Sequence, residues 1–277
     1  MPRLLDTSLD GFQVPAAVPA AALIIVHGLA EYADRYRAIA AEWAARGIST
    51  FAYDQRGHGA TPGTRTHVDR FSRFVDDLNE LLSAVHAAYP QLSVFIWGHS
   101  MGSIVAVLSA ATLHPAIHGV ITTSNSLEIF RRGTNPLNPF FRVLSRLAPR
   151  MRIPLGLDSR KISSDESVQH AYATDSRIPS TASVRLIVEF AAACEAARKV
   201  APGISLPWLN VHGAEDRIAP VAGSNALHEL LGSSDKRLQI YPGLRHEVHN
   251  EVPAARRAFV QLITQWILDH AGRSPQR

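Results

Sequence analysis

The chain has 277 residues, of which 46% are hydrophobic and 19% are charged, and its formal net charge is +4. These proportions are those of a globular protein that buries a sizeable core. A net charge this small, without a dense run of Lys and Arg, argues against a nucleic-acid partner.

The N-terminal stretch 14–26 is apolar but does not resemble a targeting or membrane segment. Pro15 and Pro19 interrupt it, its basic flank is a single Arg3, and it is too short to span a bilayer. The one cysteine, Cys194, cannot form an internal disulfide, which fits a reducing compartment. The sequence therefore predicts a soluble, cytoplasmic protein.

Short apolar runs alternate with helical patterns along the chain, which is typical of a parallel sheet whose strands are joined by crossover helices. The pair Asp10-Gly11 predicts a hairpin turn between two short edge strands. The strands of the sheet are expected at 22–27, 49–53, 93–97, 119–123, 207–212 and 237–241. The helices are expected at 34–46, 70–89 and 102–113, with a last amphipathic helix that ends at Gly272.

The segment 125–203 interrupts this alternation. It shows no strand pattern, prolines recur in it, and between Arg131 and Lys161 it holds eight basic residues against one acid. We interpret it as a mostly helical cap, inserted before the late strands and lying over the carboxyl edge of the sheet, where ligands bind in open α/β folds. The whole chain, 1–277, is then one α/β domain with 125–203 as its cap subdomain.

Residues 130–157 of this segment combine apolar side chains with six arginines. Over 140–147 the apolar residues and the arginines fall on different faces of a helix. Two interpretations stay open. Either the apolar face packs on the body of the protein, or it belongs to a mobile lid whose apolar side lines an acyl tunnel and whose basic side contacts anionic lipid surfaces.

The stretch Gly98-His99-Ser100-Met101-Gly102 follows an expected strand and precedes an expected helix. In this context, G-x-S-x-G holds a nucleophilic serine on a sharp turn, where glycine lets neighbouring backbone come close. A serine hydroxyl is a weak nucleophile, so Ser100 needs a base and a carboxylate that orients this base.

Both partners are expected after late strands of the sheet, with the acid before the histidine in chain order. Asp216 lies in the turn after one late strand, and His246 lies in the loop after the last one. Glu215 and His249 are the alternatives. We expect Glu215 to be a solvated turn residue and His249 to begin the following helix.

Two backbone N–H groups are expected to form an oxyanion hole. One belongs to Met101, directly after the nucleophile, and the other to Leu29, which Gly28 allows to turn towards the serine. We expect His27 and His99 to be structural hydrogen-bonding residues.

Five stretches of this sequence resemble motifs of the monoacylglycerol lipase and lysophospholipase branch of the α/β-hydrolases, the branch that includes the S33-type serine aminopeptidases. They read, in order, HGLAEYADRY, FAYDQRGHG, WGHSMGS, VHGAEDRIAP and YPGLRHEVHNE, and the similarity extends over nearly the whole chain. The resemblance implies the α/β-hydrolase fold, a mostly parallel sheet flanked by helices. It also implies that Ser100, Asp216 and His246 are the nucleophile, acid and base, with the N–H groups of Leu29 and Met101 as oxyanion donors.

Three positions depart from the family's pattern. Ser103 stands where a third glycine is usual, and Tyr32 replaces the usual histidine of the first motif. The expected cap reads Asp175-Ser176 where Asp-Pro is common. None of these is a predicted catalytic residue, but the difference in the cap bears on acyl specificity.

The sequence thus predicts a serine hydrolase that cleaves carboxylic esters, of monoacylglycerols or similar single-chain lipids, through an acyl-enzyme. Lysophospholipase, thioesterase and S33-type peptidase activities use the same three residues and stay open, as does a binding protein without activity on this scaffold. No spacing typical of metal ligands occurs, so neither a metal nor another cofactor is expected. The expected partners are a small acyl ester and, through the basic cap, an anionic lipid surface.

Overall fold

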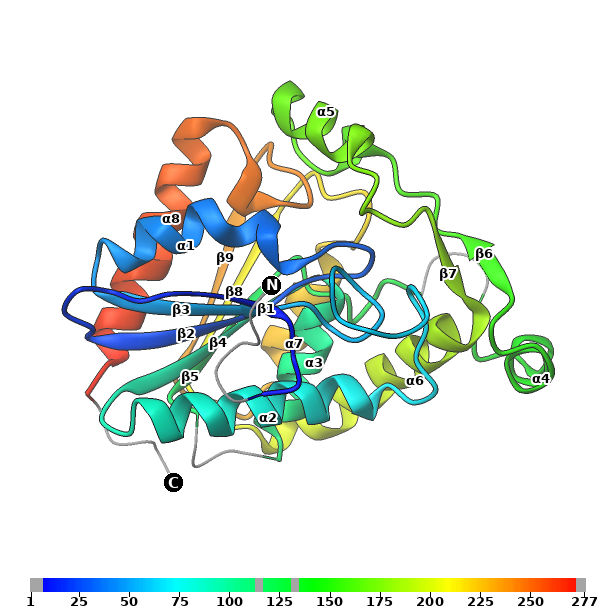
Figure 1. Ribbon diagram of the computed structural model, residues 1–277, viewed down its shortest axis with the longest axis horizontal. Coiled ribbons are helices and arrows are strands. Elements are labelled where there is room, and N and C mark those ends of the chain that lie inside the picture. Colours follow the sequence, from blue (N-terminus) through cyan, green and yellow to red (C-terminus); the bar gives the residue numbers. More distant parts are fainter. Residues whose placement is uncertain (1–6, 113–116, 131–134, 273–277) are drawn as a thin grey trace.

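A computed structural model describes residues 7–112, 117–130 and 135–272 of the chain (Figure 1). In these residues a sheet of seven strands has the order β1-β3-β2-β4-β5-β8-β9. β1 is antiparallel to β3, and the other neighbours are parallel. The strands are β1 (Gly11–Val14), β2 (Ala21–Val26), β3 (Ile48–Tyr53), β4 (Ser93–His99), β5 (Gly119–Thr123), β8 (Trp208–Gly213) and β9 (Lys236–Tyr241).

The six expected strands of the sheet are confirmed, but the expected hairpin turn at Asp10-Gly11 is wrong. Gly11 begins β1 and lies opposite Tyr53 of β3, so the strand pairs with a distant segment. A Cβ atom at Gly11 would lie 2.2 Å from the carbonyl oxygen of Ala52. Glycine is therefore needed there because two strands pack closely, and not because the chain turns.

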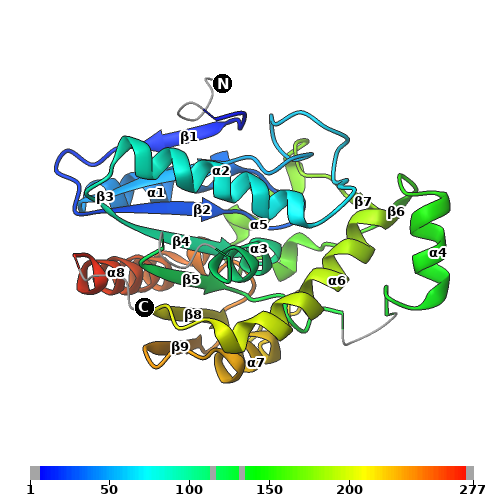
Figure 2. The ribbon, with the colours of Figure 1, turned by 90° about the horizontal axis from the view of Figure 1, so that it is seen from below.

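Helices cover both faces of the sheet (Figures 1 and 2). Trp43 of α1 packs in one buried cluster with Ile25 of β2, and α8 lies on the same face. Phe74 of α2 packs with Ile24 in the other cluster, to which α3 also contributes. The helices are η1 (Ala33–Tyr36), α1 (Arg37–Ala44), α2 (Ser72–Ala88), α3 (Met101–Ala110), α7 (Ala222–Leu230), η5 (Val248–Asn250) and α8 (Pro253–His270).

The expected helices are thus confirmed with small changes at their ends. The helix expected at 34–46 is divided into η1 and α1, and α8 ends at His270, before Gly272. Leu113, the expected end of the helix after Ser100, lies outside the described residues. Within the described residues, no helix combines the length and the apolar composition that a membrane span requires.

Between β5 and β8 the chain leaves the sheet and forms mostly helices. The elements are α4 (Pro139–Leu147), β6 (Arg152–Pro154), η3 (Ser159–Lys161), α5 (Glu166–Thr174), β7 (Thr181–Ser183), α6 (Val184–Val200) and η4 (Ala201–Gly203). The expectation of no strands is wrong, because β6 and β7 pair antiparallel. α6 packs against α3 and contributes Phe190 and Cys194 to the core, so this helix connects the segment to the body (Figure 2). The boundary of the cap at 125–203 stays a prediction.

Candidate active site

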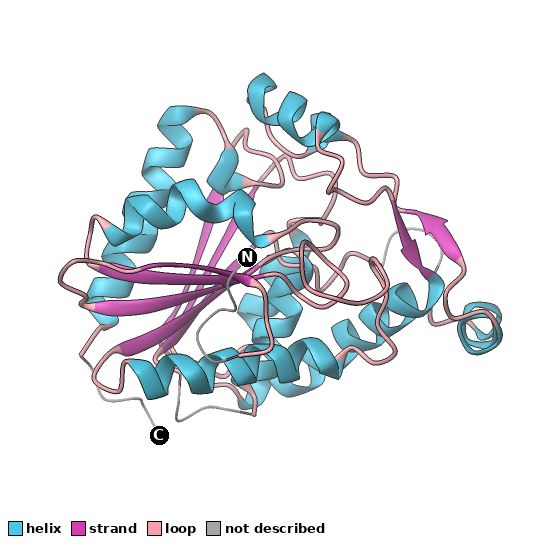
Figure 3. Ribbon diagram, in the orientation of Figure 1, coloured by secondary structure: helices cyan, strands magenta, loops and turns pink. Residues whose placement is uncertain are grey.

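The parallel strands end at one edge of the sheet, where loops lead to the segment between β5 and β8 (Figure 3). Ser100 lies there, at the turn between β4 and α3, with a positive φ of 51° that residues other than glycine rarely adopt. A Cβ atom at Gly98 would lie 2.4 Å from the carbonyl oxygen of Gly102, and one at Gly102 would lie 2.1 Å from that of Val26. Both glycines of the motif are therefore required for the backbone to hold the serine in this position.

The two predicted oxyanion donors lie on either side of Ser100. Met101 is the first residue of α3, so its N–H has no acceptor within the helix. Gly28 lies in the loop after β2, and a Cβ atom there would lie 3.1 Å from Ser100 Cβ. This close approach brings Leu29, the next residue, into the lining of the pocket that contains Ser100.

His27 holds the loop that carries Leu29. The N–H of Gln55 donates to His27 Nε2 (3.0 Å), so the proton of the neutral ring is on Nδ1, which donates to the carbonyl oxygen of Gly28 (2.7 Å). The N–H of Gly28 in turn donates to the Glu31 carboxylate. The structural role expected of His27 is therefore confirmed.

His246 and Asp216 form a hydrogen-bonded pair beside Ser100. His246 Nδ1 donates to Asp216 Oδ2 (2.7 Å), while Oδ1 accepts from the N–H groups of Ile218 (2.8 Å) and Ala219 (2.9 Å). Burial favours the neutral carboxyl group, but the nearby charge of His246 and hydrogen bonds from His212 and His246 hold the pKa of Asp216 far below its usual range. Burial lowers the pKa of His246, but the negative charge of Asp216 and their hydrogen bond raise it above the ordinary histidine value.

The alternatives, Glu215 and His249, do not lie in this arrangement. His249 is fully buried in η5 and stacks on Tyr36 with ring centroids 5.1 Å apart, and neither of its ring nitrogens has a hydrogen-bond partner among the described residues. Burial lowers its pKa to about 3, so its ring is neutral. Glu215 is exposed, as expected of a turn residue, whereas Asp216 bonds to His246.

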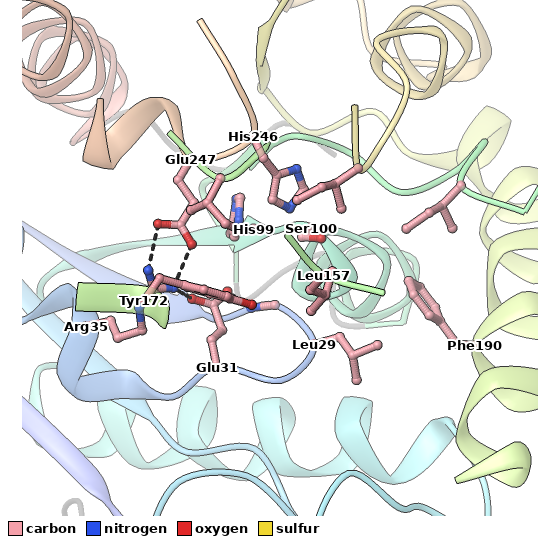
Figure 4. A pocket seen from close by; sticks show the side chains of 14 residues that line it. Leu29, Glu31, Arg35, His99, Ser100, Leu157, Tyr172, Phe190, His246 and Glu247 are labelled. Atoms are coloured by element: carbon pink, nitrogen blue, oxygen red, sulfur yellow. Dashed lines mark hydrogen bonds and ion pairs between the residues drawn. The ribbon is translucent and has the colours of Figure 1, made fainter. Parts of the chain in front are cut away.

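Ser100 and His246 line one pocket, together with Leu29 (Figure 4). In the described part of the chain no hydrogen bond joins Ser100 Oγ to His246, and the hydroxyl lies 3.5 Å from Ser126 Oγ. Such bonds often form only when the substrate is bound, so this geometry does not argue against the predicted roles. Among the described residues, no group of three His, Cys, Asp or Glu side chains is placed to hold a metal ion.

One end of the pocket is polar and buried. Arg35 lies between Glu31 (2.8 Å) and Glu247 (2.6 Å), and its guanidinium lies 5.1 Å from the ring centroid of Tyr172 on α5 (Figure 4). Burial disfavours the charged forms of Glu247 and Arg35. The positive charge of Arg35 nevertheless lowers the pKa of Glu247 to about 2, and the carboxylates of Glu247 and Glu31 raise the pKa of Arg35. Sequence reasoning missed this group, although Glu31, Arg35 and Glu247 lie within the quoted motifs.

The other end of the pocket is apolar and shares its wall with a second cavity of about 310 Å³. We call this second cavity the apolar channel. The residues that line both the pocket and the channel are Leu29, Ile129, Leu157, Phe190 and Ile218. The channel thus lies beside the Ser100 pocket, between loops of the body and the segment between β5 and β8.

Two of the three departures from the family's pattern lie near each other, because Tyr32 contacts the residues on either side of Ser176. The hydroxyl of Tyr32 donates to Asp175, and the guanidinium of Arg177 lies 4.1 Å from the centroid of the Tyr32 ring. These contacts attach the end of α5 to the loop after β2. The third departure, Ser103, donates its hydroxyl to the carbonyl oxygen of Ser100 (2.6 Å), which fixes the first turn of α3.

Comparison with known proteins gives a consistent result. The family model described as serine aminopeptidase, S33, matches residues 17–253. A monoacylglycerol lipase of Mycolicibacterium smegmatis is 32% identical over 92% of this chain and 91% of its own length. Human monoglyceride lipase is 30% identical over 91% of this chain and 84% of its own length. The crystal structure of a Paleococcus ferrophilus monoacylglycerol lipase superimposes with a TM-score of 0.82 at 26% identity, over 94% of this chain and 99% of that one.

Proposed function

Since this chain belongs to the serine aminopeptidase S33 family of α/β-hydrolases, we propose that it is a serine hydrolase that cleaves carboxylic esters, with monoacylglycerols as preferred substrates. The shape of the pocket supports this proposal most directly. Ser100 and His246 lie between a small polar end and a long apolar end, as an ester of a short polyol with one acyl chain requires.

In the proposed reaction Ser100 Oγ attacks the ester carbonyl while His246 Nε2 accepts its proton and Asp216 holds the opposite side of the imidazole ring. The carbonyl oxygen becomes negative and accepts hydrogen bonds from the N–H groups of Leu29 and Met101. His246 then donates the proton to the leaving alcohol. Water cleaves the acyl-enzyme by the same steps in a second half-reaction, so no metal or other cofactor is needed.

The polar end supports a neutral alcohol over a phosphorylated one. Hydroxyl groups can donate to the carboxylates of Glu31 and Glu247, which outnumber the single guanidinium of Arg35. A phosphate group would place another negative charge beside them in a buried site, where such a contact is costly. This charge balance favours monoacylglycerol lipase over lysophospholipase activity.

The test is a comparison of substrates that carry the same acyl chain. We expect kcat/KM for a monoacylglycerol to exceed that for the matching lysophospholipid and acyl thioester by at least about tenfold, and a proline amide to be inert. The Ser100→Ala protein measures the background rate for each substrate. A higher kcat/KM for the lysophospholipid, the thioester or the amide would contradict the proposal.

We further propose that the segment 125–203 is a cap whose helix α4 touches lipid surfaces from the cytoplasmic side. Three apolar side chains of α4 do not pack on the body: Phe140 is 68% exposed, Val143 is 52% exposed and Leu147 is 80% exposed. Arg142, Arg146 and Arg150 on and after the same helix are also exposed. An outward apolar surface flanked by arginines is typical of a helix that lies at an anionic lipid interface.

Replacing Arg142, Arg146 and Arg150 with Gln is expected to weaken binding to anionic vesicles by up to about 100-fold at low salt, because each arginine contributes about 1 kcal/mol there. Sedimentation with anionic and neutral vesicles at several ionic strengths measures this effect. The hydrolysis of a short, water-soluble ester by the same variant should be unchanged. Equal binding of the unaltered protein to both vesicle types at low salt would rule out the proposed contact.

A further inference from the structure

We propose that Lys161 and Arg217 form an anion-binding subsite at the outer end of the apolar channel, and that the enzyme therefore accepts esters whose acyl chain ends in a carboxylate. This inference rests on the proposed ester hydrolysis and adds a class of acyl group to it. Monoesters of long-chain dicarboxylic acids are the simplest substrates of this class.

Three cavities with shared walls lie between Ser100 and the surface. The pocket at Ser100 shares five lining residues with the apolar channel, and the channel shares Lys161 and Arg217 with a third, polar cavity of about 460 Å³. We call this third cavity the outer hollow; its charged lining residues are Asp158, Arg160, Lys161, Glu215, Arg217 and Arg245. Lys161 and Arg217 line both the channel and the hollow, so they mark the place where an extended acyl chain would leave its apolar surroundings.

The two cations that face the channel are also the ones whose side chains are uncommitted. Arg160 is paired with Asp158 (2.9 Å), and Arg245 donates to the carbonyl oxygens of Arg160 (2.6 Å) and Ser163 (2.8 Å). The side chains of Lys161 and Arg217, by contrast, make no hydrogen bond or ion pair with any other described residue. They can therefore bind a ligand anion without breaking an existing contact.

Glu215 provides the opposing charge. Its carboxylate lines the same outer hollow and is likewise unpaired among the described residues. With Arg160 paired to Asp158, the outer hollow holds three cations, Lys161, Arg217 and Arg245, against one anion, so Glu215 reduces the attraction for a carboxylate without cancelling it. Removing Lys161 or Arg217 should therefore weaken the binding of a terminal carboxylate, whereas removing the charge of Glu215 should strengthen it.

The position of the charges predicts a dependence on chain length. A short chain would leave its terminal carboxylate in the apolar channel, where burial of an unpaired charge is unfavourable. A longer chain would place it between Lys161 and Arg217, next to water, where an exposed ion pair is modestly favourable and is weakened by salt. The ratio of kcat/KM for the ester that ends in a carboxylate to kcat/KM for the ester that ends in a methyl group should therefore rise from below one to above one as the chain lengthens.

The experiment compares two series of p-nitrophenyl esters with equal chain lengths, one ending in a methyl group and one in a carboxylate. The ratio of their kcat/KM values does not depend on the fraction of active protein. For the longest chains we expect Lys161→Met and Arg217→Met each to lower this ratio about twofold to fivefold, and the double variant about tenfold. Glu215→Gln should raise this ratio about twofold, and 0.5 M salt should lower it. The control variant Arg257→Met removes an exposed cation of α8 and should leave the ratio unchanged.

A ratio that does not respond to Lys161→Met, Arg217→Met and Glu215→Gln would overturn the subsite. A second measurement separates this result from a failure of the proposed function. Titration calorimetry on the Ser100→Ala protein with non-hydrolysable amides of both series should show the same preference and the same order of variants. If binding shows this preference but neither ester series is cleaved by the unaltered protein, the subsite stands and the proposed hydrolysis is wrong.

Discussion

Ser100→Ala is expected to abolish ester hydrolysis, with a loss of about 10⁶-fold in kcat, because removal of the nucleophile from a serine hydrolase leaves only binding and the oxyanion hole. The fold should be preserved, since an alanine methyl group is smaller than the hydroxymethyl group of serine. Hydrolysis of a monoacylglycerol and labelling by a fluorophosphonate probe measure the effect. The unaltered protein should be labelled at Ser100, and the variant should not react.

Ser126→Ala is the matched control for this substitution. Its hydroxyl is 3.5 Å from that of Ser100, so it is the nearby serine that could replace Ser100 as the nucleophile. This variant should retain labelling and activity within about tenfold, because Ser126 does not lie on the turn between β4 and α3. Loss of labelling in Ser126→Ala, with retention in Ser100→Ala, would show that the nucleophile is wrongly assigned.

His246→Ala is expected to reduce kcat by a similar factor, about 10⁶-fold, because the base and the nucleophile act as a unit. His249→Phe is the comparison that separates the two candidate bases. Phenylalanine keeps the aromatic packing on Tyr36, and within the described part of the chain neither ring nitrogen of His249 has a hydrogen-bond partner to lose. This variant should stay within about tenfold of the unaltered enzyme, and the reverse pattern would mean that His249 is the base.

The same assignment determines the pH dependence. His246 must be neutral to accept a proton, and Asp216 raises its pKa above the ordinary value of 6.5. Activity should therefore be low where the ring is protonated, and kcat/KM should rise with pH through the pKa of His246. Asp216→Asn removes the negative charge and should shift this transition to lower pH. A profile that is flat between pH 5 and 9 would contradict a histidine base.

The chain order of strands and motifs was sufficient to predict which residues approach one another at the edge of the sheet. Apolar runs predicted six strands, and the parallel arrangement places their carboxyl ends together. Residues that directly follow these strands, among them Ser100, Asp216 and His246, were therefore expected in one place, and the structure brings them together. Their catalytic roles stay predictions.

The amphipathic pattern of 140–147 could not show which way the helix faces. A period of 3.6 residues identifies an apolar face but not the surface that this face meets. Phe140 and Leu147 of α4 are exposed, so the first of the two open interpretations, packing on the body, is wrong for these side chains. The expected lining of an acyl tunnel is wrong for α4 as well, because no residue of this helix lines the Ser100 pocket or the apolar channel. The orientation of α4 depends on its contacts with α6, a helix that is distant from it in the chain.

The sequence by itself determined the family, the sheet and the positions after its strands, because these follow from local patterns and their order. Only the tertiary structure decided the surroundings of the site. Arg35 meets Glu247 across 212 positions of the chain, and Tyr32 meets Asp175 across 143. Pairs of this kind have no signature in spacing or periodicity, since any acid and any base could pair in an unfolded chain. The packing of the sheet, the loops and the cap selects the pairs that form, and the pair of Arg35 with Glu247 determines the polar end of the pocket.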